Sequence, residues 1–174
     1  MEEDRRLVAR IVETEAYTGD DPACHGWRLK QKRSNGEIPE GKGSELFGSP
    51  GRAYVYLCYG IHWLFNVVTE PEGTCGAVLV RAVEPVEGLD QMREHRESPH
   101  RDVALTNGPG KLTQALAIDD RFHEQLLDGP DLYLTPGETP PPSAITTTPR
   151  IGISKATDRP WRFLLKDNPY VSAP

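Results

Sequence analysis

Two runs rich in β-branched and aromatic residues, 52–59 and 61–69, meet at the dipeptide Tyr59-Gly60. So short a connection permits only an antiparallel hairpin, because a parallel crossover needs roughly a dozen residues or more. The hairpin therefore fixes two neighbouring strands of a sheet before any other element is considered. Similar runs predict further strands at residues 7–17, 76–84, 132–134, 150–154 and 161–165.

Helical spacing of apolar residues is confined to the second half of the chain. Pro85 suits the first turn of a helix that extends to about Glu97, and further helices are predicted at 109–118 and 120–127. Consecutive strands with peripheral helices are typical of the α+β class. We expect a single domain over residues 1–174, with a curved antiparallel or mixed β-sheet and a protruding β-hairpin.

Composition supports this prediction and excludes several classes of protein. The 16 glycines and 16 prolines among 174 residues favour turns and long loops over a helical bundle, and residues 18–51 form one such connection. Apolar stretches such as 77–80 are too short to span a membrane, and the acidic residues 2–4 do not suit a signal peptide. Three cysteines without a CxxC pair indicate reduced thiols. We therefore expect a cytoplasmic protein.

The net charge of −6 is unevenly distributed along the chain. Residues 28–52 carry six basic and three acidic side chains, and residues 149–174 carry five and two. Residues 84–148 carry twelve acidic and five basic side chains. The basic segments could face a polyanion while the acidic block stays solvated, or the charges could average out over the surface. Charge alone leaves both possibilities open.

Two charged residues lie inside runs that otherwise predict buried strands. Alternation places Ile11, Glu13, Glu15 and Tyr17 on one side of the first strand. Arg81 interrupts the apolar run 77–83 in the same way. A buried carboxylate and a buried guanidinium each need a partner, so Glu15 and Arg81 are expected to pair. Such a pair serves a structural role more often than a catalytic one.

The hairpin concentrates aromatic side chains, five of them between Tyr54 and Phe65. Most aromatic residues in strands belong to the core, but Tyr59 stands beside a turn glycine with little protein around it. An exposed aromatic residue at a hairpin tip is typical of a contact with a partner. Asn66, a polar residue in an apolar strand, is either a satisfied core amide or a group that recognises a ligand.

Residues 107–111 (NGPGK) open a predicted helix with small residues. Backbone N–H groups around Gly110, together with the Lys111 ammonium, could meet a phosphate of a DNA backbone. The segment lacks the spacing of a nucleotide-binding loop. Cys24 and His25 are adjacent but have no third or fourth ligand in the pattern, so we predict no metal site.

Five segments together resemble the alkyladenine (3-methyladenine) DNA glycosylase family, and they follow one another in the family's order. They are 11–25 (IVETEAYTGDDPACH), 48–68 (GSPGRAYVYLCYGIHWLFNVV), 76–85 (GAVLVRAVEP), 107–118 (NGPGKLTQALAI) and 150–154 (RIGIS). The family normally has a helix and a strand ahead of the segment that begins here at Leu7. Residues 27–47 are longer and more basic than the family's stretch, so the resemblance assigns them no role.

The resemblance implies the catalytic residues. Glu15 matches the general base that activates a water against the anomeric carbon of a flipped nucleotide. Arg81 matches the arginine that helps hold that water and carboxylate. Ile151 matches a position whose backbone carbonyl contacts the same water.

The resemblance also implies how the lesion is held. Tyr17, His25 and Tyr56 match the residues that enclose the extruded base. Tyr59 matches the wedge that enters the minor groove and fills the gap left by the base. Asn66 matches the asparagine that disfavours guanine through its exocyclic amino group.

On this resemblance we expect a base-excision enzyme without cofactor or metal. It would act as a monomer near the nucleoid on double-stranded DNA that contains 3-methyladenine, 7-methylguanine, hypoxanthine or ethenoadenine, and it would not cleave the strand. One alternative is a protein that binds lesions without turning them over. A second is a sugar- or nucleoside-hydrolysing enzyme that uses Glu15 with a second carboxylate such as Glu13, although this alternative leaves Tyr59 unexplained.

Overall fold

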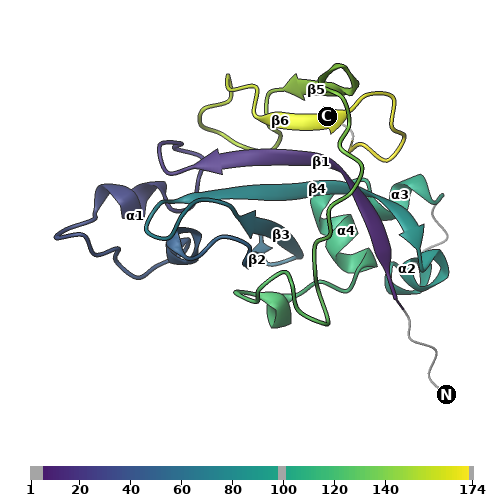
Figure 1. Ribbon diagram of the computed structural model, residues 1–174, viewed down its shortest axis with the longest axis horizontal. Coiled ribbons are helices and arrows are strands. Elements are labelled where there is room, and N and C mark those ends of the chain that lie inside the picture. Colours follow the sequence, from purple (N-terminus) through teal and green to yellow (C-terminus); the bar gives the residue numbers. More distant parts are fainter. Residues whose placement is uncertain (1–5, 98–100, 173–174) are drawn as a thin grey trace.

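The computed structural model describes residues 6–97 and 101–172 and thus leaves out the acidic start of the chain. The described part forms one six-stranded sheet (Figure 1). Every pair of neighbouring strands is antiparallel, in the order β2-β3-β4-β1-β6-β5. The α+β prediction is confirmed. The strands are β1 (Val8–Thr18), β2 (Ala53–Cys58), β3 (His62–Val68), β4 (Gly76–Glu87), β5 (Ile145–Thr148) and β6 (Arg162–Leu165).

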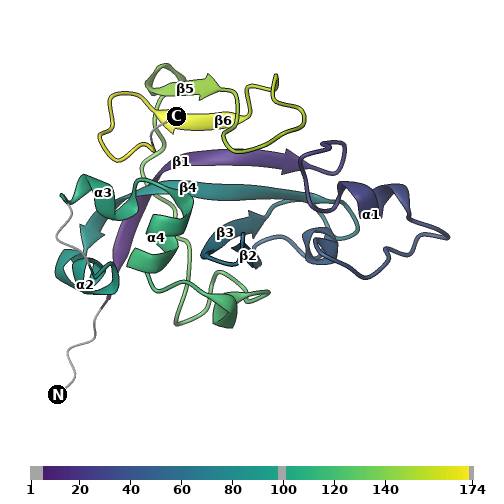
Figure 2. The ribbon, with the colours of Figure 1, turned by 180° about the vertical axis from the view of Figure 1, so that it is seen from behind.

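Short helices cover both faces of the sheet. On one face α4 packs on β3 and β4, with α2 and α3 beside it (Figure 2). The core there joins Val55, Phe65 and Val80 to Leu112 of α4. On the other face the connection between β1 and β2 folds over Tyr54 and Ala77. The helices are α1 (Trp27–Gln31), α2 (Leu89–His95), α3 (Val103–Thr106) and α4 (Pro109–Ala115), with 3₁₀ turns η1 (Ser44–Phe47), η2 (Asp120–Phe122) and η3 (Pro142–Ala144).

The strand register aligns one row of side chains across the whole sheet, and all of them except Leu79 are polar. Each member lies directly opposite the next, and directly opposed residues of antiparallel strands point to the same face. The row therefore brings residues that are far apart in sequence to the face opposite α4. From β2 to β5 its members are Tyr54, Asn66, Leu79, Glu15, Arg162 and Thr148.

A register shift in β1 breaks the predicted alternation. Ile11 pairs with Val83 and Glu13 with Ala82, so Val12 is left without a partner in β4. Such a bulge places two neighbouring residues out of the normal alternation. Ile11 is exposed, whereas Glu13 is 1% exposed. The prediction that Ile11 shares the environment of Glu13 and Glu15 is therefore wrong.

Several predicted element boundaries also need correction. Pro85 lies within β4, opposite Ala9, and the helix begins only after Gly88, whose φ of 81° turns the chain. Residues 150–154 form an irregular loop, and residues 132–134 contribute only a bridge from Tyr133 to Asp128. The helix predicted at 120–127 is limited to a 3₁₀ turn, and the threonine-rich strand β5 was not predicted.

Candidate active site

Glu15 lies at the centre of the polar row and is 0% exposed. Three donors surround its carboxylate. The Tyr17 hydroxyl donates to Oε2 at 2.7 Å, and the Ile151 backbone N–H donates to Oε1 at 2.8 Å. Arg81 Nη1 lies 3.2 Å from Oε1. The expected pairing of Glu15 with Arg81 is therefore present, and it joins β1 to β4 within the sheet.

Glu13 forms a second buried centre beside Glu15. Its Oε1 accepts from Arg81 Nε at 2.9 Å, from Arg162 Nε at 2.6 Å and from the Ser172 hydroxyl at 2.8 Å. Its Oε2 accepts from the Ser172 backbone N–H at 2.6 Å. Burial on its own raises the pKa of Glu13, but the bonds from Arg162 and Ser172 outweigh it and hold this pKa below its ordinary value. Glu13 is thus a buried anion.

Tyr17 lies between Glu15 and a second buried ion pair. Burial, with the nearby Glu15 carboxylate, raises the pKa of Tyr17 far above its ordinary value, so its hydroxyl remains a donor. The Arg150 guanidinium stacks over the Tyr17 ring, 4.5 Å from its centroid. Arg150 itself bonds to the Asp21 carboxylate and to the Ala16 carbonyl. This anchor holds the loop that presents the Ile151 N–H to Glu15.

His25 and Tyr56 form an aromatic cluster with Tyr54. The His25 and Tyr56 ring centroids are 4.5 Å apart, edge to face, and His25 Nδ1 lies 2.9 Å from the Tyr54 hydroxyl. The ammonium of Lys42 lies over Tyr56, 4.7 Å from the ring centroid. The predicted residues Tyr56 and His25 are therefore in direct contact, and Tyr54 joins them.

The pH dependence of folding should report this cluster. Burial, followed by the Lys42 charge, lowers the pKa of His25 to about 4 from 6.5. The unfolded chain therefore binds a proton between about pH 6.5 and pH 4 that the folded protein does not bind. Stability from this group is present above pH 6.5 and falls by up to about 3 kcal/mol as the pH drops through this window. Urea unfolding of the parent and His25→Gln between pH 4 and 7 measures the difference. If the free energies of unfolding of the two proteins changed in parallel with pH, His25 would not be a buried neutral histidine in the folded state.

Asn66 stands in the polar row between Tyr54 and Leu79. It is buried, and its Nδ2 donates to the Tyr54 carbonyl at 3.1 Å. This bond keeps the amide on the same face as the aromatic cluster.

Tyr59 lies at the tip of the β2–β3 hairpin and is 90% exposed. Its φ is 51° and that of Gly60 is 70°, and the Ile61 N–H donates to the Cys58 carbonyl at 3.1 Å. Two successive residues with positive φ are the arrangement of a type I′ turn. A bulky residue there is a backbone outlier, and such outliers cluster at functional sites. Leu57 and Ile61 extend the exposed apolar tip.

The first turn of α4 has a packing role that the sequence did not predict. A side chain at Gly110 would meet the His62 ring at 2.8 Å, so glycine lets the helix approach β3. Lys111 Nζ donates to Asn107 Oδ1 at 2.8 Å and thereby ties the first turn together. Both residues thus have contacts within the protein.

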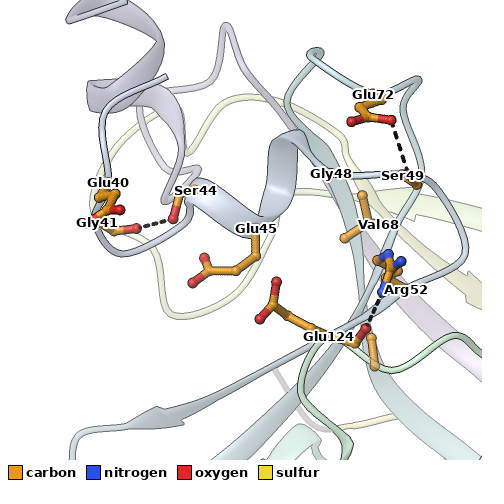
Figure 3. A pocket seen from close by; sticks show the side chains of 11 residues that line it. Glu40, Gly41, Ser44, Glu45, Gly48, Ser49, Arg52, Val68, Glu72 and Glu124 are labelled. Carbon is orange, nitrogen blue, oxygen red and sulfur yellow. Dashed lines mark hydrogen bonds between the residues drawn. The ribbon is translucent and has the colours of Figure 1, made fainter. Parts of the chain in front are cut away.

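A cavity of about 680 Å³ opens elsewhere, between η1 and the start of β2 (Figure 3). The side chains of Glu40, Glu45, Glu72 and Glu124 make its lining acidic, and Arg52 Nη1 is bonded to the Glu124 carbonyl at 2.8 Å. Its lining includes none of the candidate residues described above. Because carboxylates repel phosphates, this cavity does not suit a DNA backbone.

The described ranges contain neither a candidate metal site nor a membrane-spanning helix. No group of three His, Cys, Asp or Glu side chains within residues 6–97 and 101–172 is arranged to hold a metal ion. Across the same residues, no helix has the length and apolar character required to cross a bilayer.

Several residues of this region were missed by the sequence analysis. Arg162 gave the same signal as Arg81, a charge inside an apolar strand, and Tyr54 shares a face with Tyr56 by simple alternation. Ser172 and Arg150 gave no comparable signal, because their contacts depend on loops whose course no periodicity predicts.

Comparison with known proteins shows the family of this chain. A family model for methylpurine-DNA glycosylase matches residues 1–169. A protein of Salinibacter ruber is 55% identical over 168 residues, which is 96% of this chain and 81% of its own length. A protein of Prosthecochloris aestuarii is 51% identical over 163 residues, or 93% of this chain and 74% of its own. Both are named "Putative 3-methyladenine DNA glycosylase". The resemblance recognised in the sequence is thereby confirmed, and the chain belongs to the methylpurine-DNA glycosylase family.

Proposed function

We propose that this protein excises alkylated purines from double-stranded DNA by hydrolysis of the N-glycosidic bond, with Glu15 as the general base. One observation carries the proposal: a fully buried carboxylate, held by Tyr17, Arg81 and the Ile151 N–H, lies on the sheet face that also carries the aromatic cluster. A base can be reached by such a site only after it is flipped out of the duplex.

The chemistry needs no group beyond those present and water. The water oxygen attacks C1′ while the C1′–N bond breaks, and the electron pair of that bond leaves with the base. The water proton passes to Glu15, whose Oε2 accepts one bond from Tyr17 and retains a free lone pair. The same negative charge stabilises the oxocarbenium-like transition state. Because Glu15 is not exposed to solvent in the free protein, the attacking water has to enter the site together with the flipped nucleotide.

The leaving group decides which lesions suit this site. A cationic alkylpurine such as 3-methyladenine or 7-methylguanine leaves as a neutral base, whereas hypoxanthine and ethenoadenine need a proton. His25, with its pKa lowered to about 4, is neutral at pH 7 and is therefore a poor acid. Arg150 lies over one face of the Tyr17 ring and Lys42 over one face of the Tyr56 ring, and the opposite face of each ring would attract a cationic base. We therefore propose cationic alkylpurines as the preferred substrates and the neutral lesions as slower ones.

Tyr59 is proposed to enter the duplex and occupy the space of the flipped base. The exposed tip of the hairpin supports this role, because an aromatic side chain there has no core to fill. The basic residues of 28–52 and 149–174 other than the buried Arg150 and Arg162 would contact the phosphates.

One assay tests the function. Duplexes containing 7-methylguanine or hypoxanthine are incubated with the protein, and alkali then converts each abasic site to a strand break. Breaks that need alkali, and that form faster on 7-methylguanine, are expected. Binding of lesion DNA without any break would support the alternative of a lesion-binding protein. Breaks without alkali would contradict a purely hydrolytic enzyme.

The discrimination against guanine tests the role proposed for Asn66. Guanine differs from hypoxanthine by one exocyclic amino group, and Asn66→Ser removes an amide that opposes it. We expect excision of guanine from G·T mispairs to rise roughly tenfold relative to hypoxanthine. Loss of the bond to the Tyr54 carbonyl should cost about 1 kcal/mol of stability. An unchanged ratio of the two rates, with that stability loss, would assign Asn66 a structural role only.

A further inference from the structure

We propose that Glu13 is a positioning residue, which holds the Arg81 guanidinium against Glu15 and shares its positive charge. This inference rests on the proposed function of Glu15. Glu13 is two residues away on the same strand and faces the same side, but the Arg81 guanidinium lies between them.

Each nitrogen of the Arg81 guanidinium has a different partner. Nε donates to Glu13 at 2.9 Å, Nη1 lies 3.2 Å from Glu15, and Nη2 donates to the Ser172 hydroxyl at 3.4 Å. The shortest of these contacts is the one to Glu13. A planar group fixed at three corners cannot turn, so Glu13 and Ser172 determine where Nη1 meets the carboxylate of Glu15.

Arg162 makes this arrangement possible. It approaches Glu13 from β6, with Nε 2.6 Å from Oε1, while its Nη2 donates to the Ser172 carbonyl at 3.0 Å. The charges of two carboxylates and two guanidiniums therefore cancel within the sheet, where burial of an unpaired charge would destabilise the fold. Glu13 neutralises part of the charge of Arg81 that would otherwise act on Glu15 alone.

The structure also gives Glu13 a connection to the end of the described chain. Both the backbone N–H and the hydroxyl of Ser172 donate to Glu13. The segment after β6 is thereby fastened to β1 directly beside the proposed general base. The experiment therefore has to separate this structural role of Glu13 from its positioning role.

The test is the pH profile of the single-turnover excision rate for Glu13→Gln on 7-methylguanine DNA. Without the Glu13 charge, Arg81 acts fully on Glu15, and a cation beside a carboxylate favours its ionised form. We expect the acid limb to move down by about one pH unit. The plateau rate should fall roughly 10- to 100-fold because Arg81 is less well fixed. Other charged or titratable groups that face the two carboxylates are Arg162, Arg150, Tyr17 and Tyr56. Burial holds the pKa of both tyrosines well above its ordinary value.

Two further variants separate charge and positioning from general stability. Glu84→Gln removes a partly buried carboxylate of β4, which accepts a bond at 3.1 Å from Asn168 in the segment after β6 but does not contact Arg81. It should keep the parental rate and acid limb. Glu13→Asp keeps the charge, so its acid limb should stay with the parent while its rate falls.

A folded Glu13→Gln protein with the parental rate and acid limb would overturn the inference, as would an equal loss in Glu84→Gln. If Glu13→Gln does not fold, Ser172→Ala decides, since it removes only the hydroxyl that bonds to Glu13 and Arg81. A roughly fivefold slower rate is expected and a parental rate would overturn the inference. A parent that excises no lesion would instead refute the proposed function itself.

Discussion

Glu15→Gln should reduce excision by about a thousandfold or more while lesion DNA still binds at nearly the parental affinity. An amide cannot take the proton from water, and it carries no charge to stabilise the transition state. The side chain keeps its size and can still accept a bond from Ile151 or Tyr17, so the site should retain its shape. Single-turnover rates on 7-methylguanine DNA, with affinities from fluorescence anisotropy, provide the two measurements.

Glu84→Gln is the matched control for this variant, since it makes the same chemical change on the neighbouring strand β4. Its rate should equal that of the parent. Excision by Glu15→Gln within a factor of ten of the parent would exclude Glu15 as the general base.

Tyr59→Asn should weaken lesion binding and base flipping without destabilising the protein. The aromatic ring recovers about 1–3 kcal/mol of the stacking lost when the base leaves the duplex. Asparagine tolerates the positive φ of this turn, and Asn-Gly is the favoured sequence of a type I′ turn. Thermal stability should therefore stay equal or rise, while affinity for lesion DNA falls roughly tenfold or more. A fluorescent base analogue beside the lesion reports the return to the stacked state.

Tyr133→Ala is the control for loss of an exposed tyrosine, because Tyr133 lies in another loop and is also exposed. It should change neither binding nor flipping. Equal affinities of the parent and Tyr59→Asn would remove Tyr59 from the proposed interface. Unfolding of Tyr59→Asn would mean that the turn has a role in the core.

The sequence predicted those parts of the fold that depend on local patterns. The strands at β1 to β4 follow from β-branched and aromatic runs, and the hairpin follows from Tyr59-Gly60. Pro85 misled the prediction because φ near −65° suits both a helix start and the outer part of a strand. The bulge at Val12 was invisible because it depends on the register of β4 rather than on any residue of β1. Strand β5 has three threonines after Ile145 and is stabilised by its pairing with β6.

The residues of the candidate site likewise differ in whether a local sequence pattern predicts them. A lone charge in an apolar strand was sufficient to single out Glu15 and Arg81, because burial of either residue demands a partner. Glu13 was noticed only as a spare carboxylate, since its partner Ser172 lies 159 residues further along the chain. Arg150 was assigned to a strand, and its stacking on Tyr17 follows from a loop conformation that spacing cannot reveal.

The four buried charges in the middle of the sheet have a consequence for directed evolution. Buried ion pairs are often less stabilising than well-packed apolar residues of similar volume. Replacing Glu13, Glu15, Arg81 and Arg162 together by apolar side chains should therefore give a fold at least as heat-resistant as the parent. A library selected for heat resistance alone would drift toward such cores and lose activity. Thermostable variants of this protein have to be selected for turnover in every round, with gains sought in surface loops such as 132–142.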